Sequence, residues 1–121
     1  MTATASALYA FYSGFDMPAY QTDSVPDGAA LPYITYLYQE PRNDLPATHY
    51  AMVYMRTNSN EDLLSAAGRI VSAIGEGVVL PGGVVIRPAS PLVQVMVDGS
   101  DPDVREAYIN LQLNGFHTPG A

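Results

Sequence analysis

The sequence predicts an α+β domain in which two helices pack on one face of a mainly antiparallel sheet of four to five strands, with a small β-hairpin added. Two segments place apolar residues at helical spacing, and several short segments are rich in β-branched and aromatic residues. Turn-forming residues separate these segments. The 121 residues match the usual length of one domain, so we expect a single domain over residues 1–121.

The N-terminal residues 3–15 are predicted to form a short amphipathic helix. Leu8, Phe11, Tyr12 and Phe15 recur at spacings of three and four, and Gly14 is the expected end of the helix. Residues 16–32 contain many turn formers, which predicts an extended loop along the surface.

Two antiparallel strands are predicted at residues 33–39 and 49–57, because both segments are rich in β-branched and aromatic residues. Residues 41–46 join them and form a loop longer than a tight hairpin turn. We expect the tip of this loop, with Arg42, Asp44 and Leu45, to project toward a partner.

The second helix is predicted to begin at Ser59, which forms a variant capping box with Asp62 three residues later. Its apolar face is expected to consist of Leu63, Leu64, Ala67, Ile70, Val71 and Ile74. Gly75 should end the helix, because glycine readily adopts the left-handed conformation that ends many helices.

The last third of the chain is predicted to form only strands and turns. Residues 78–80 and 84–87 flank Pro81, Gly82 and Gly83, which predicts a hairpin with two short arms. Residues 92–97 predict a further strand, and residues 98–103 an acidic turn. Residues 105–113 alternate between apolar and polar side chains, as a half-buried strand does.

The charge balance opposes ordinary nucleic-acid binding. The chain has five basic residues, all arginine, against twelve carboxylates, and its formal charge is −7. Nucleic-acid binders neutralise phosphates with clustered lysine and arginine, whereas these arginines are single and widely spaced. No apolar run approaches the roughly 18 residues that a membrane span requires, so we expect a soluble protein made in a cytoplasm.

The residue types predict no enzyme, no cofactor and no metal site. The chain has no cysteine, and its two histidines, His49 and His117, lack a zinc-binding spacing and suit ordinary surface or edge roles. There is no G-x-S-x-G motif, and the glycine-rich residues 75–83 contain no lysine. The acidic turn could offer oxygen ligands to a hard cation, but a solvated turn between strands is the stronger interpretation.

Tyrosine is unusually frequent in the first two predicted strands, which contain Tyr33, Tyr36, Tyr38, Tyr50 and Tyr54. These residues fall on both faces of the strands, and only one face can point at the helices. Because tyrosine is enriched at protein interfaces, a subunit interface and a partly solvated aromatic cluster explain this pattern equally well.

Two stretches of the sequence resemble one family. Residues 14–36 read GFDMPAYQTDSVPDGAALPYITY and residues 90–117 read SPLVQVMVDGSDPDVREAYINLQLNGFH. The first is similar to the opening of the tail-terminator family of siphophages of Gram-positive hosts, whose members are often described as minor capsid proteins. The second is similar to that family's closing strands, with matching positions at Pro91, Gln94, Asp98, Asp101, Arg105, Tyr108, Ile109 and Asn110.

The resemblance spans nearly the whole chain, since the segments between the two stretches follow the family's order. Two departures concern contacts rather than class: Tyr54 stands near the position of an expected tryptophan, and Arg105-Glu106 stands where a Lys-Arg pair is expected. The matching residues resemble structural positions of the family, and the resemblance implies no catalytic residues for this chain.

The resemblance implies a structural protein of the virion, located at the head–tail junction after assembly in the host cytoplasm. Such a subunit forms a homo-oligomeric ring, expected to be a hexamer, on the last ring of the tail tube. The ring stops tube polymerisation and joins the tube to the head connector. The implied partners are further copies of the chain, the major tail tube protein and a head-completion or neck protein, while phage DNA passes through the lumen without specific binding.

Three sets of residues are candidate interface positions: Arg42, Asp44 and Leu45 in the loop, Pro81, Gly82 and Gly83 in the hairpin turn, and Tyr33, Tyr36, Tyr38 and Tyr54 in the sheet. The first alternative is a head-closure or neck adaptor protein of the same virion. The second is a small acidic ligand-binding or enzymatic domain that uses the turn at residues 98–103, for which a deep pocket there would be evidence.

Overall fold

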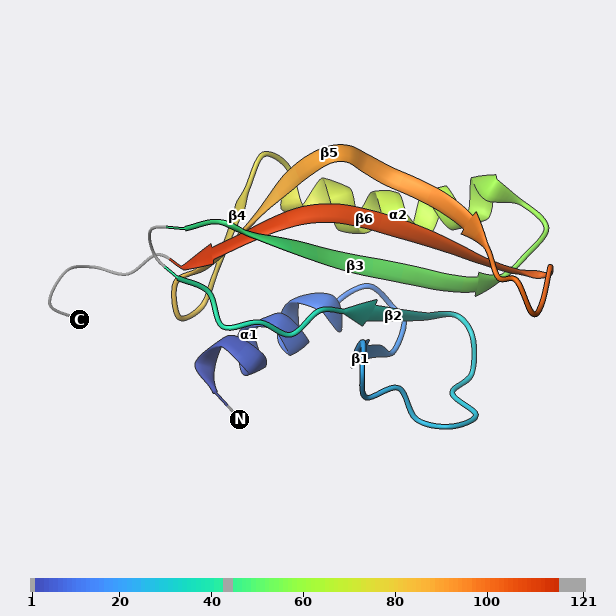
Figure 1. The fold of residues 1–121 in the computed structure, drawn as a ribbon, viewed down its shortest axis with the longest axis horizontal. Helices are drawn as coiled ribbons and strands as arrows, with labels where there is room; N and C mark the ends of the chain where they lie inside the picture. The colour runs from blue at the N-terminus through green and yellow to red at the C-terminus, as the bar shows by residue number, and fades with distance from the viewer. Residues whose placement is uncertain (1, 43–44, 116–121) are drawn as a thin grey trace, which may run out of the picture.

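The computed structural model describes residues 2–42 and 45–115 and confirms the α+β class (Figure 1). The helices are α1 (Ala3–Tyr12) and α2 (Asn60–Ile74). The strands are β1 (Ala19–Gln21), β2 (Tyr33–Tyr36), β3 (Ala47–Arg56), β4 (Val78–Leu80), β5 (Val84–Val97) and β6 (Val104–Gly115).

The strands form one mixed sheet of six strands in the order β1-β2-β3-β6-β5-β4. All neighbours pair antiparallel except β1 and β2, which are parallel. The prediction of four to five mainly antiparallel strands therefore gave too few strands and missed one parallel pair.

The missed strand is β1, which lies inside the segment predicted to be a loop. It has only three residues, too few to show an alternating pattern, and Pro18 precedes it. Two flanking backbone hydrogen bonds extend its pairing with β2: Ile34 N donates to Pro18 O at 2.8 Å, and Thr22 N donates to Tyr36 O at 2.9 Å.

β5 joins two segments that were predicted to be separate strands. It runs for 14 residues, so the prediction of two short hairpin arms was wrong for this arm. Pro88 and Pro91 obscured its continuity in the sequence. The structure accommodates them because β4 pairs only with residues 84–86, which leaves the rest of β5 at a sheet edge, and because the pairing with β6 shifts register between Pro88 and Val93.

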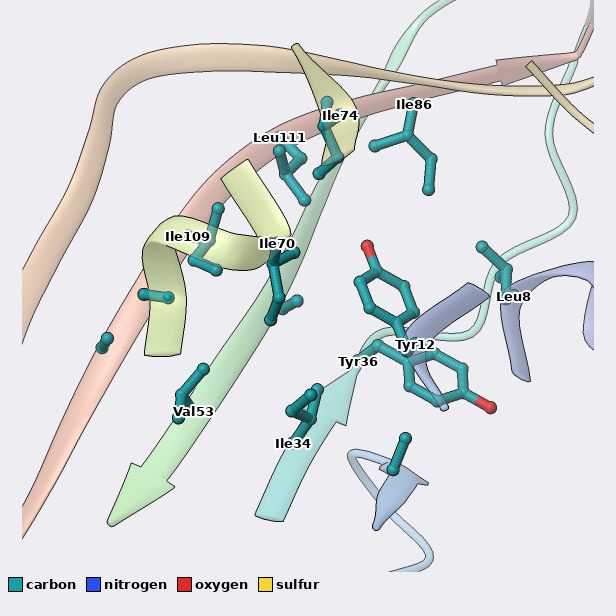
Figure 2. Packing of buried hydrophobic residues seen from close by; sticks show 14 of the residues in the cluster. Leu8, Tyr12, Ile34, Tyr36, Val53, Ile70, Ile74, Ile86, Ile109 and Leu111 are labelled. Atoms are coloured by element: carbon teal, nitrogen blue, oxygen red, sulfur yellow. The ribbon is translucent and has the colours of Figure 1, made fainter. Parts of the chain in front are cut away.

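Both helices pack on the same face of the sheet. Figure 2 shows Leu8 and Tyr12 of α1 and Ile70 and Ile74 of α2 in one cluster with side chains of the sheet. The sheet contributes alternate residues, among them Ile34, Tyr36, Val53, Ile109 and Leu111, all of which are buried. This cluster is the core of the domain.

The ends of the helices differ in their capping. Thr2 caps α1, because its Oγ1 accepts a hydrogen bond from Ala5 N at 3.0 Å. Ser59 stands at the N-cap of α2 as predicted, but its side chain makes no capping hydrogen bond. Gly75, with φ of 57°, follows the last residue of α2 as predicted.

One residue of the predicted apolar face of α2 lies elsewhere. Leu64 is 44% exposed and belongs to the outward surface of the helix. Among the described residues, no helix is long and apolar enough to cross a membrane.

Candidate protein interface

The sheet face opposite the helices carries a cluster of tyrosines. Tyr20, Tyr33, Tyr50, Tyr54 and Tyr108 alternate with core residues along β1, β2, β3 and β6, so their side chains lie on the other face. All five are partly exposed. We call these five residues the tyrosine platform.

Ring contacts order the tyrosine platform. The rings of Tyr33 and Tyr54 stack with centroids 5.0 Å apart, and those of Tyr50 and Tyr108 do the same at 5.0 Å. Tyr20 meets Tyr33 edge-on at 5.8 Å. Rings that already stack on one another lose little conformational entropy when a partner protein covers them, so less free energy is lost on binding.

A carboxylate adjoins this platform. Glu106 lies opposite Tyr54 in the pairing of β3 with β6. Partial burial, and then the nearby charge of Asp98, raise the pKa of Glu106. Burial is also the largest cause that raises the pKa of Tyr33 and of Tyr54, and the charge of Glu106 adds to it in both. The platform is therefore aromatic and locally acidic.

No arginine among the described residues forms an ion pair with Glu106. The ion pairs found there join Arg56 to Asp101 at 2.9 Å and Arg69 to Asp16 at 3.3 Å. In this part of the chain Glu106 consequently has no arginine partner.

The structure divides the tyrosines that were predicted as one interface. Tyr33 and Tyr54 lie on the platform. Tyr36 does not: it is 1% exposed and stacks on Tyr12 with centroids 4.9 Å apart, so its prediction as an interface residue was wrong. Tyr38 lies beyond the end of β2, packs partly buried against the core, and hydrogen-bonds to Thr2 and Glu40.

Three members of the platform were not among the candidate interface residues. Tyr50 was noted in its strand but not selected. Tyr20 was missed because β1 was not recognised. Tyr108 stands on the polar side of the alternation predicted for residues 105–113, and this alternation was a sufficient signal to place it opposite the core.

The two predicted interface loops meet at one end of the sheet. Gly115 N donates to Arg42 O at 2.9 Å, and Gly115 pairs with Val84, directly after the turn at residues 81–83. Leu45 is 53% exposed. Asp44 lies outside the described residues.

The hairpin turn at this end packs near α1. Gly82 and Gly83 have φ of 83° and 81°, which glycine adopts without strain, and Pro81 and Gly82 are exposed. Between this turn and α1 is an apolar hollow of about 370 Å³ lined by Ala3, Ser6, Ala7, Ala10, Pro81 and Gly82.

His49 was predicted to have a surface or edge role. It is instead fully buried, in the middle of a chain of hydrogen bonds. Tyr12 Oη lies 2.9 Å from His49 Nε2, and His49 Nδ1 lies 3.0 Å from Gln39 Oε1. Gln39 Nε2 donates to Thr48 O at 2.8 Å, so Gln39 Oε1 is free to accept from Nδ1–H. Nε2 then accepts the Tyr12 hydroxyl proton. Burial lowers the pKa of His49 to about 4, so the imidazole is neutral at pH 7. His117 lies outside the described residues.

Two of the three carboxylates of the acidic turn accept hydrogen bonds from residues of the turn itself. Asp98 Oδ1 accepts from Ser100 N at 2.8 Å and from Ser100 Oγ at 2.7 Å, and Asp101 Oδ1 accepts from Asp103 N at 3.0 Å. Within residues 2–42 and 45–115, no group of three or more His, Cys, Asp or Glu could hold a metal ion. The hollow beside α1 does not border this turn, and neither does a smaller one of about 180 Å³ near Gln21 and Tyr38.

Comparison with protein-family models finds no match for this chain. A search of curated proteins likewise finds no match.

Proposed function

We propose that this protein is a ring-forming tail terminator, a structural subunit that caps the tail tube of a siphophage at the head–tail junction. The observation that carries the proposal is the tyrosine platform: a preordered aromatic sheet face that no described helix covers, on a subunit whose other sheet face is closed by two helices. The resemblance of residues 14–36 and 90–117 to the tail-terminator family supports it.

The mechanism is geometric. In a cyclic ring each subunit uses two different faces, one for each neighbour, and closure of the ring uses up both faces. The two ends of the ring remain. One end binds the last ring of tube protein, and the other binds the head-completion protein instead of more tube protein, so growth stops.

The charge suits a channel for DNA. Each copy has a formal charge of −7, so a ring of several copies is strongly acidic. An acidic lumen repels the phosphate backbone, which lets the genome pass without specific binding. The protein then has no catalytic role and needs no cofactor.

A tube-growth assay tests the proposal. The purified chain is added to its cognate tail tube protein while tubes polymerise, and tube lengths are measured by electron microscopy. We expect substoichiometric amounts to shorten the tubes and the protein to sit at one end. A chain that leaves the tube lengths unchanged and binds a portal-side protein instead would indicate the neck adaptor.

A further inference from the structure

The tyrosine platform needs a complementary surface on its neighbour, and the same chain offers one on the outward side of α2. This inference depends on the ring proposed above. A closed ring joins each subunit to the next through two different surfaces, so the surface that covers the platform must lie elsewhere on the chain.

The tyrosine platform suits a partner surface that carries a cationic side chain. Its stacked rings present π-faces, and Glu106 adds a carboxylate without an arginine partner among the described residues. A guanidinium satisfies both features, because it stacks on aromatic rings and pairs with carboxylates.

The positions of the arginines point to one of them. Arg56 and Arg87 alternate with core residues, so they share the platform's own sheet face. Arg105 bonds to Asn60 at the start of α2. Arg42 is in the loop beside residues that the structure does not describe. Arg69 lies on α2, on the opposite side of the molecule from the platform.

The outward surface of α2 suits close packing. Its first turn exposes the carboxylates Glu61 and Asp62, and the later turns carry small side chains around Arg69. At least partly exposed in these turns are Leu64, Ser65, Gly68, Ser72 and Ala73. An added Cβ at Gly68 would meet no atom within 4 Å, so the space above this glycine is open. Small side chains next to an exposed leucine let flat aromatic rings approach the helix.

Arg69 is also able to change partner. Its ion pair with Asp16 joins side chains that are 50% and 91% exposed. Such an exposed pair contributes little to stability, so its loss costs little when Arg69 enters an interface.

We propose that the tyrosine platform of one subunit packs on the outward surface of α2 of a second copy, whose Arg69 lies over Tyr33 and Tyr54 beside Glu106. The ring then stacks subunits front to back, with each sheet covered on one face by its own helices and on the other by its neighbour's α2.

Disulfide trapping tests this contact directly, because the natural chain contains no cysteine. The variant Tyr33→Cys/Leu64→Cys is oxidised under the conditions in which the ring forms, alone and on tube ends. We expect a ladder of covalent oligomers up to the closed ring, while either single variant gives no covalent dimer. The control Tyr9→Cys/Leu64→Cys, with the 51% exposed Tyr9 on α1 on the helix side of the sheet, should give no ladder.

A charge exchange tests the same contact without cross-linking. Glu106→Arg and Arg69→Glu should each weaken assembly by about tenfold or more, and the double variant should recover most of the loss. Glu106→Gln is a milder variant that keeps the side-chain shape, and the recovery in the double variant is the internal control. Circular dichroism confirms that each variant is folded.

The outcomes separate this inference from the proposed function. Rings that cap tubes but give no ladder and ignore the charge variants overturn the contact and leave the function standing. A ladder without any effect on tubes supports the contact and contradicts the function. Covalent dimers from a single-cysteine variant, or a chain that is monomeric both alone and on tubes, overturn the contact.

Discussion

His49 stands in the middle of a buried hydrogen-bond chain that requires a neutral imidazole. A protonated ring would donate from both nitrogens, which would take away the acceptor of the Tyr12 hydroxyl proton. Nothing in the sequence near His49 signals this role, because its partner Tyr12 is 37 positions away. The burial depends on tertiary packing, and a local pattern cannot show it.

Stability should fall in weak acid because of His49. Burial lowers its pKa from 6.5 to about 4 in the folded state, so the unfolded chain binds the proton more tightly. The stabilisation of the fold by neutral His49 is complete above pH 6.5 and is lost as the pH falls toward 4. The unfolding free energy falls by about 3 kcal/mol over this range. Urea unfolding of the wild type and of His49→Gln across this range is the measurement, since the carboxylates titrate in both. Parallel pH profiles would refute the assignment.

Tyr12→Phe isolates the hydroxyl group at the other end of the same chain. The ring and its stacking on Tyr36 remain, but His49 Nε2 loses its donor inside the core. We expect a loss of about 1–3 kcal/mol in unfolding free energy at pH 7. Tyr9→Phe is the matched control on the same helix, because Tyr9 is 51% exposed. Equal effects of the two variants would show that the buried hydroxyl contributes nothing.

At the scale of elements, the sequence is most informative where a segment is long and periodic. Helix α2 and strand β6 follow their predicted patterns closely, and Gly75 ends α2 as expected. Strand β1 has no readable pattern in three residues, and prolines divide β5 in the sequence although the sheet edge tolerates them. Predicting these two strands requires knowledge of their neighbours in the sheet.

The two helix starts offer a matched comparison. Thr2→Ala removes the side-chain cap of α1, together with the exposed hydrogen bonds of Thr2 to Tyr38 and Glu40, and should lower the unfolding free energy by about 1 kcal/mol. Ser59→Ala removes no capping hydrogen bond from α2 and should change it by less than about 0.5 kcal/mol. Thermal or urea unfolding of both variants provides the values. A larger effect at Ser59 than at Thr2 would contradict the described capping.

At the scale of the whole molecule, the two sheet faces have different roles. One face builds the core with α1 and α2, and the other presents ordered tyrosines beside an acidic side chain. The excess of tyrosine in residues 33–57 and its spread over both strand faces were visible in the sequence, but the assignment of each tyrosine to core or surface was not. It depends on strand register, which placed Tyr36 inside and Tyr33 outside.

Native mass spectrometry of the chain, alone and bound to short tubes of its cognate tail tube protein, tests whether subunits close into a ring through the tyrosine platform. We expect one closed oligomer of defined copy number, in solution or at the tube end. It should be lost in Tyr33→Ala/Tyr54→Ala and kept in the control Tyr9→Ala. A chain that is monomeric under both conditions, or a ring that the platform variant leaves intact, would contradict this expectation.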